Sequence, residues 1–424
     1  METFLILSFI GMALIGVPVA YALALSVSAV LYFYMDLPQV LITHNMFSGI
    51  DSFSFMAVPF FMLAGAFMSA GGVTKRLVNV AQAMVGSFTG GLAQAVAVAG
   101  MFFAAISGSS AATTAAIGST MVNEMERKGY RRELATGIVA AAGTVGIVIP
   151  PSITFVVYGV IANVSIGDLF MGGVLPGILM GLAMCFMGWF IAKKEGIPPE
   201  GHFSVIHLLK TIKDAFWAMM TPVIIIGGIY GGIFTPTEAA AVAAVYGIVV
   251  GLFVYKELKL VDFPEIVFKA VIGSTLIMFL VGAAKVFGWM MTNLQIPHHV
   301  GEAVVALTSS PIVFLMIMNV LLIVLGTLVN ASAAVVILTP IFLPVATTLG
   351  IDPLHFGVVM VVNLAIGCIT PPVGLDLFVA SAITKVPLEK VMKATTPYLL
   401  ALIATLVVIT LVPQISLFLP GILQ

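Results

Sequence analysis

Apolar runs of about 20 residues, the length needed to cross a lipid bilayer, recur along the whole chain. Hydrophobic residues make up 61% of the 424 residues and charged residues only 8%, whereas soluble domains carry roughly 25% charged residues. So few charged residues cannot cover the surface of a water-soluble protein of this size. The net charge of −1 gives no excess of positive charge that could attract nucleic acid. Because helices satisfy their own backbone hydrogen bonds in lipid, the sequence predicts an all-α polytopic membrane protein.

Ten apolar runs are the predicted membrane segments, five on each side of a polar linker that begins at Lys193. They cover residues 3–15, 18–34, 52–70, 134–163, 173–192, 217–233, 236–255, 270–291, 355–384 and 396–416. Two of them, 134–163 and 355–384, are too long for one simple helix and are interrupted by glycines and a Pro-Pro pair. Two further apolar regions, about 91–120 and 311–342, carry small polar residues at their centres.

The two halves of the chain resemble each other at an offset of 221 residues. Gly146-Ile-Val-Ile-Pro150-Pro151 is matched by Gly367-Cys-Ile-Thr-Pro371-Pro372. Few other positions are identical, so the charged loops provide the stronger argument. In each equivalent pair of loops, one loop contains Lys or Arg and the other contains neither. The pairs, with the basic loop first, are 122–133 and 343–354, 71–76 and 292–301, 385–393 and 164–172, and 256–269 and 35–51.

This alternation predicts two inverted-topology repeats, since cytoplasmic loops are enriched in Lys and Arg. The regions 91–120 and 311–342 then fit only as re-entrant hairpins, one in each repeat. We therefore expect a first repeat over 1–192, a cytoplasmic linker with an interfacial amphipathic helix over 193–216, and a second repeat over 217–424.

Inverted repeats with broken helices are typical of secondary transporters. Proline frees backbone carbonyls, which cannot face lipid unpaired, and a hard cation such as Na⁺ would satisfy them together with Ser, Thr and Asn oxygens. Helix N-termini at the hairpin tips would favour a carboxylate substrate. The competing interpretation is that small residues and prolines merely permit close helix packing. A Pro-Pro break and a hairpin with small polar residues occur at equivalent positions of both halves, and this repetition favours a role in binding the ion and the substrate.

A few charged residues lie close to or within the apolar runs. Lys285 is the only Lys or Arg inside one, and it either meets a carboxylate substrate or holds a scaffold or subunit contact. Glu238 follows Pro236 at the start of a run, where a carboxylate suits the helix dipole. Cys185 and Cys368 lie far apart in apolar surroundings, so we expect neither a disulfide nor a transition-metal site.

Four stretches, SGSSAATTAAIGS, GIVIPPSITFVVYGV, PTEAAAVAAVYG and ITPPVGLDLFVAS, resemble the large membrane (M) subunit of tripartite ATP-independent periplasmic (TRAP) transporters. The similarity runs over essentially the whole chain. It implies an elevator-type, sodium-coupled importer of organic acids, such as C4-dicarboxylates, sialic acid or other sugar acids, in the bacterial inner membrane. It further implies a small four-helix membrane (Q) subunit and a periplasmic substrate-binding (P) protein as partners, with Na⁺ as coupling ion and no organic cofactor.

The resemblance also implies two sodium sites between hairpin tips and broken helices. The residues implied for the first site are Ser107, Ser110, Gly143, Thr144 and Pro150. Those implied for the second site are Gly326, Asn330, Gly367, Thr370 and Pro371. The candidates for substrate binding are Ser109, Ser152, Asp376 and Lys285, and Asp376 departs from the neutral Asn of the family pattern.

Two other functions are alternatives to this interpretation. A stand-alone sodium- or proton-coupled anion transporter of similar design would need no binding protein. An intramembrane enzyme would need an acid–base pair, a nucleophile with its base, or metal ligands within a span. The apolar runs contain no HExxH motif and no paired Asp, so the chain is not expected to be an enzyme.

Overall fold

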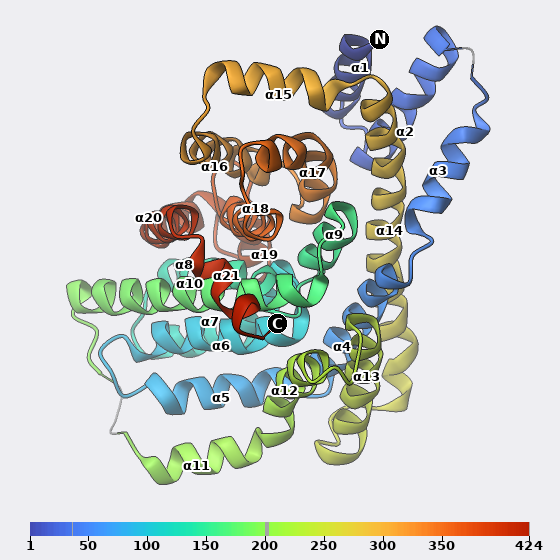
Figure 1. Cartoon of the computed structure of the whole chain (residues 1–424). Coiled ribbons are helices and arrows are strands. Elements are labelled where there is room, and N and C mark those ends of the chain that lie inside the picture. The colour runs from blue at the N-terminus through green and yellow to red at the C-terminus, as the bar shows by residue number, and fades with distance from the viewer. Residues whose placement is uncertain (36, 200–202, 424) are drawn as a thin grey trace.

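The computed structural model describes residues 1–35, 37–199 and 203–423, and every regular element in them is helical (Figure 1). The helices of the first part are α1 (Glu2–Leu14), α2 (Val19–Val30), α3 (Val40–Ile50), α4 (Ala57–Ala70), α5 (Val73–Val85), α6 (Gly91–Ser107), α7 (Ser110–Arg127), α8 (Arg132–Gly143), α9 (Ile153–Ala162) and α10 (Ile166–Glu195). Those that follow are α11 (Val205–Asp214), α12 (Phe216–Tyr230), α13 (Pro236–Val249), α14 (Phe263–Asn293), α15 (Ile296–Leu307), α16 (Pro311–Leu328), α17 (Ala331–Thr348), α18 (Pro353–Gly367), α19 (Leu375–Thr384), α20 (Leu388–Leu411) and α21 (Gln414–Leu423). Short 3₁₀ or π turns are η1 (Leu31–Met35), η2 (Phe53–Met56), η3 (Thr144–Ile147), η4 (Val250–Val254) and η5 (Leu260–Asp262).

Within the described residues, seven helical segments are individually long and apolar enough to cross a membrane. They are Phe53–Ala70, Ile166–Glu195, Pro236–Val254, Leu260–Asn293, Pro311–Leu328, Ala331–Thr348 and Leu388–Leu411. The pair α11 and α12, bent by 65°, brings the number to eight if it counts as one span. Five of the seven coincide with predicted spans, and the other two are α16 and α17, the arms of the second predicted hairpin. The other five predicted spans are not among the seven, because the helices near the N-terminus are short, α12 counts only together with α11, and the two interrupted segments are divided into shorter pieces.

Both interrupted segments are broken where their Pro-Pro pairs occur. In the first, α8 ends at Gly143, continues as the turn η3, and resumes as α9 only at Ile153. In the second, α18 ends at Gly367 and α19 begins at Leu375. Proline has no backbone N–H and its ring clashes with the preceding turn, so neither helix can continue through its pair. The predicted breaks at 134–163 and 355–384 are confirmed.

Each predicted hairpin is a pair of helices joined by two residues. The connection from α6 to α7 is Gly108-Ser109, where Gly108 has φ +61° and the Ser109 hydroxyl accepts a hydrogen bond from the Ala112 N–H. The connection from α16 to α17 is Val329-Asn330, and the Asn330 side chain caps α17. Such capping oxygens satisfy N–H groups that a helix start otherwise leaves unpaired. Both hairpins extend beyond the predicted limits, to Arg127 and Thr348.

Three regions that the sequence interpretation treated as loops are helical. Residues 35–51 contain α3, the segment 292–301 contains the start of α15, and 71–76 contains the start of α5. These helices escaped notice because they mix polar and apolar residues and are too short to resemble spans. The linker helix α11 is present as expected, although residues 200–202 of the predicted linker lie outside the described residues.

Helices from the two halves of the chain alternate in one packed body. Helix α9 packs on α17, α7 on α19, and α8 on α20, while α10 packs on α6, α18 and α20. The Tyr158 hydroxyl of α9 donates to the Pro353 carbonyl over 2.6 Å, and Lys390 of α20 pairs with Glu133 of α8 at 3.0 Å. The hairpins and broken helices therefore form a single body that also includes α10 and α20.

A second group of helices borders this body. The long helix α14 stands upright beside α2 and α3 in Figure 1 and also packs on α4. Helix α13 packs on α4, and its start is fixed by a capping box between Thr235 and Glu238, which supports the structural role expected for Glu238. Helix α14 reaches the packed body through α17.

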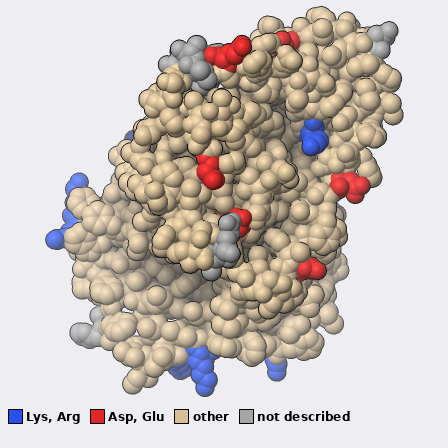
Figure 2. Space-filling view, viewed as in Figure 1, with Lys and Arg blue, Asp and Glu red and all other residues tan. Residues whose placement is uncertain are grey.

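Charged residues are scarce over the visible face of the molecule. Figure 2 shows most of that face without charge, with the visible Lys and Arg mainly along the lower and left edges, where α5, α11 and the end of α10 lie in Figure 1. On this face the visible Lys and Arg residues therefore lie mainly towards one side, which is the pattern expected if that side is cytoplasmic.

Candidate functional site

The first break lies directly against the tip of the first hairpin. A Cβ atom on Gly143 would stand 1.8 Å from the Thr114 hydroxyl oxygen and 3.1 Å from the Ser110 carbonyl oxygen, and a Cβ atom on Gly146 would stand 2.5 Å from the Thr113 hydroxyl oxygen. The Ile153 N–H donates to the Gly108 carbonyl over 3.4 Å. Glycine is thus required at the break because the hairpin approaches its backbone so closely.

The hydroxyl groups of this region are buried, and most of them bond to the backbone. The Ser107 and Thr113 hydroxyls lie 2.9 Å apart, and the Thr144 hydroxyl donates to the Ala141 carbonyl over 2.7 Å. Thr114 is fully buried and its hydroxyl oxygen has no hydrogen-bond partner. Buried polar atoms normally have partners, so the Thr114 hydroxyl marks a place suited to a further ligand.

The second break meets the second hairpin through glycine backbones. A Cβ atom on Gly367 would stand 2.6 Å from the Gly326 Cα atom. Beyond the break, the Gly374 N–H donates to the Thr327 carbonyl over 3.1 Å. The structure therefore brings the two glycines predicted for the second sodium site into direct contact, and it places α19 beside the same hairpin tip.

The other candidates at the second site are held by local bonds. The Asn330 side-chain oxygen accepts from the Ser332 N–H over 2.9 Å, and the Thr370 hydroxyl donates to the Ile366 carbonyl over 2.8 Å. Pro150 and Pro371 each form a cis peptide bond with the proline that follows. The ten residues of the two predicted sodium sites thus lie at the two breaks or at the tips of the hairpins that pack against them.

The four substrate-binding candidates have different surroundings. Ser109 caps α7. Ser152 is fully buried, and its hydroxyl donates to the Ile147 carbonyl over 2.6 Å. Asp376 is also fully buried. Lys285 alone lines the cavity described next, so the structure does not gather these four side chains in one cavity.

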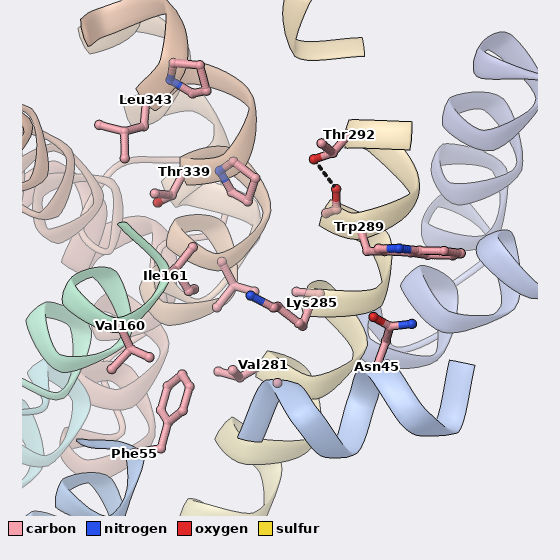
Figure 3. A pocket seen from close by; sticks show the side chains of 16 residues that line it. Asn45, Phe55, Val160, Ile161, Val281, Lys285, Trp289, Thr292, Thr339 and Leu343 are labelled. Carbon is pink, nitrogen blue, oxygen red and sulfur yellow. Dashed lines mark hydrogen bonds between the residues drawn. The ribbon is translucent and has the colours of Figure 1, made fainter. Parts of the chain in front are cut away.

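A cavity of about 430 Å³ separates α14 and α3 from α9 and α17. Its walls are mostly apolar and include Ile161 of α9 and Val281 of α14. A few polar groups, among them Asn45 of α3 and Thr339 of α17, also line it. Figure 3 shows these side chains around the space. A concave, largely apolar cavity with few polar groups is the usual form of a small-molecule site.

Lys285 supplies the cation of this cavity. Figure 3 shows its side chain reaching from α14 towards Ile161 on the opposite wall. The start of the side chain passes close to α3, because a Cβ atom on Gly49 would stand 2.6 Å from the Lys285 Cβ atom. Among the described residues no carboxylate forms an ion pair with Lys285, so its ammonium group is available to an anionic ligand.

Several polar residues of this region were not assigned a role from the sequence. Thr113 and Thr114 were visible as part of the hairpin motif, but their contacts with Gly146 and Gly143 depend on helix packing. A buried chain links Asn363 to Asn319 over 2.8 Å and Asn319 to Thr410 over 3.0 Å. Asn45 lies in α3, a helix that the apolar pattern did not predict, so no sequence signal pointed to it.

Comparison with known proteins finds several similar transporter permeases. The chain is 46% identical over 96% of its length to the isethionate TRAP transporter permease protein DctMQ of Oleidesulfovibrio alaskensis, of which it spans 64%. It is 45% identical over 89% of its length to the C4-dicarboxylate TRAP transporter large permease protein DctM of Pseudomonas aeruginosa, covering 88% of that protein. It is 37% identical over 98% of its length to the sialic acid TRAP transporter large permease protein SiaM of Vibrio cholerae, covering 97% of it.

A solved structure supports the fold. The YdaH transporter of Alcanivorax borkumensis superposes with a TM-score of 0.60 at 17% sequence identity, covering 87% of this chain and 86% of its own. The family model described as "Tripartite ATP-independent periplasmic transporter, DctM component" matches residues 6–415. The named relatives are transporter permeases and not enzymes, which confirms the prediction from the sequence about the class of this protein. The chain therefore belongs to the DctM family of TRAP transporter large permease subunits.

Proposed function

We propose that this permease imports an organic acid across the bacterial inner membrane in symport with Na⁺. The pair of helix breaks, each packed against a hairpin tip, carries this proposal. Broken helices place unpaired carbonyl groups within the membrane, where a coupling ion can take their hydrogen-bonding role. The sodium ligands would come from the ten residues named above, at the two contacts between break and hairpin.

The substrate would reach the cavity that contains Lys285. An ammonium group in a mainly apolar space attracts a carboxylate or sulfonate group far more strongly than it would in water. The relatives named for isethionate, C4-dicarboxylate and sialic acid carry such anionic groups in their substrates. Among those chemistries the cavity fits a small organic anion, held by Lys285 and by polar groups such as Asn45 and Thr339.

Alternating access would proceed by an elevator motion. The mobile unit in this proposal is the packed body of hairpins and broken helices together with α10 and α20, because these helices are in close contact. The scaffold would be the group around α4, α13 and α14. The cavity lies along the boundary of the two groups, where a substrate could be exposed to one side and then to the other. The repeats over 1–192 and 217–424 would be inverted, joined by the cytoplasmic linker 193–216.

Two partners belong to this proposal, a small membrane (Q) subunit and a periplasmic substrate-binding (P) protein. The relative from Oleidesulfovibrio alaskensis is longer than this chain and carries both letters in its name, DctMQ, which supports a shared assembly. Uptake of radiolabelled C4-dicarboxylate, isethionate or sialic acid should be measured in proteoliposomes with and without Na⁺, Q subunit and loaded P protein. Uptake that needs all three supports the proposal, whereas Na⁺-independent uptake by this chain alone would overturn it.

A further inference from the structure

Asp376 is a fully buried carboxylate without a partner. It lies in the first turn of α19, directly after the second break, with 0% of its surface exposed. Neither carboxylate oxygen has a hydrogen-bond partner of normal geometry, and none of the ion pairs among the described residues includes it. An unpaired charge in such a place is among the most costly arrangements in a protein, and within a membrane segment it points to function.

The start of α19 does not relieve this cost. Helix N-termini can stabilise a carboxylate through their free N–H groups. Here the Asp376 N–H donates to the Cys368 carbonyl over 2.9 Å, and the Leu377 and Phe378 N–H groups both donate to the Gly374 carbonyl, over 3.0 Å and 3.3 Å. These donors are directed at backbone oxygens and leave the carboxylate unsatisfied.

A hydroxyl group and the Cys368 thiol lie close to the carboxylate. Helix α7 packs against both α19 and α8, and the Ser110 hydroxyl of α7 faces Asp376. One turn further along α7 lies Thr114, whose buried hydroxyl oxygen has no partner either, and residues four apart share a helix face. Carboxylate and hydroxyl oxygens brought together without a cationic side chain match the ligand set of a hard metal cation.

We propose that Asp376 and Ser110 bind Na⁺ at the contact between α7 and α19. This inference rests on the sodium coupling proposed above and adds a charged ligand to it, supplied by the second half of the chain to the hairpin of the first half. The carboxylate would stabilise the ion and also be neutralised by it. A buried carboxylate repels an anionic substrate, so Asp376 serves the ion and not the substrate.

The test is the Na⁺ dependence of the melting temperature of the purified complex of large and small subunits, with choline chloride holding the ionic strength constant. A ligand that binds only the folded state raises its stability. Asp376→Asn should melt at or above the wild-type temperature without Na⁺, since the uncompensated charge is gone. Its Na⁺ midpoint should rise by about tenfold or more, which corresponds to the loss of about 1.4 kcal/mol of binding energy.

Two further variants make the result specific. Glu389→Gln removes an exposed carboxylate from the first turn of α20 and should leave the Na⁺ midpoint unchanged. Ser110→Ala keeps the charge and removes one oxygen ligand, so its midpoint should rise by a smaller factor. It also provides the measurement if Asp376→Asn fails to fold.

The inference is wrong if Asp376→Asn or, where that variant does not fold, Ser110→Ala keeps the wild-type Na⁺ midpoint, whatever happens to the melting temperature itself. In that case the sodium coupling of the transporter still stands. If the wild-type complex shows no response to Na⁺, the proposed sodium coupling fails, and this inference fails with it.

Discussion

The two places where a hairpin of one half touches the broken helix of the other differ in charge. Where the second hairpin meets α9, the Ser332 and Thr154 hydroxyls lie 3.4 Å apart and form a neutral hydrogen bond. Where the first hairpin meets α19, Ser110 faces the unpartnered carboxylate of Asp376. The same architectural contact is thus neutral and hydrogen-bonded at one place, and at the other it contains a carboxylate for which we propose a Na⁺ partner.

The backbone contacts at the two breaks differ as well. Gly367 packs against the backbone of Gly326, whereas Gly143 packs chiefly against the side chain of Thr114. Backbone atoms cannot move aside without shifting a whole helix, but a side chain can be shortened by mutation. The tightest contact of Gly367 is therefore with backbone, and the tightest contact of Gly143 is with a side chain that a mutation can shorten.

The largest expected effect follows from this difference. Gly367→Ala should destabilise the protein by about 3 kcal/mol or more, at the upper end of the usual cost of overpacking. Gly143→Ala should also destabilise it, but the double variant Gly143→Ala with Thr114→Ala should recover most of the loss. Thermal unfolding of the purified complex measures all three, and a lack of rescue by Thr114→Ala would show that the first break is equally rigid.

Lys285 should affect the substrate and not the ion. Lys285→Met removes the cation of the cavity while keeping a long apolar side chain, so the KM for uptake should rise about tenfold to a hundredfold, as expected for loss of one charged partner in a desolvated pair. Lys285→Arg, which keeps the charge, is the matched control and should retain more activity. An unchanged KM in Lys285→Met would assign this residue to the scaffold contact with α3.

Smaller changes are expected for oxygen ligands at the hairpin tips. Asn330→Ala should raise the Na⁺ concentration for half-maximal uptake severalfold. The loss of binding free energy should be roughly that of one hydrogen bond to a charged group. This variant tests the second site as Ser110→Ala tests the first. Unchanged Na⁺ affinity in both variants would remove the hairpin tips from the ion sites.

The smallest effect belongs to the neutral contact. Thr154→Val preserves the shape of the side chain and removes its hydroxyl, so stability should fall by only about 0.6 kcal/mol, the average for such bonds in a membrane protein. The Na⁺ midpoint should not move. A large Na⁺ effect in Thr154→Val would mean that both contacts bind the ion and that they do not differ in this respect.

How far the fold could be predicted depended on whether the signal was local. The Pro-Pro pairs that begin at Pro150 and Pro371 coincide with the two breaks, whereas single prolines such as Pro176 lie inside continuous helices. Small polar residues between apolar runs indicate hairpins, so both features were predicted close to their true positions. Helix α3 was missed, because it is short and alternates polar with apolar residues. The burial of Asp376 could not be foreseen either, since it depends on how α7, α8 and α19 pack.

The site shows the same division. The glycines and hydroxyls of the two breaks could be named from sequence, because the family motif and the repeat both mark them. Their pairing could not, since Thr114 meets Gly143 only through contact between α7 and α8. The cavity around Lys285 brings together α3, α9, α14 and α17, which are distant in sequence and share no motif.

The 65° bend between α11 and α12 has a mechanical consequence. Helix α11 has a strongly polar and a strongly apolar side, with Ile206 81% exposed and Leu209 60% exposed, and such a helix floats at the lipid surface. In the elevator motion proposed above, the movement of the mobile helices through the membrane would exert an opposing force on the scaffold. In that proposal α11, lying flat at the lipid surface, would resist this force and keep the scaffold at a constant depth in the membrane.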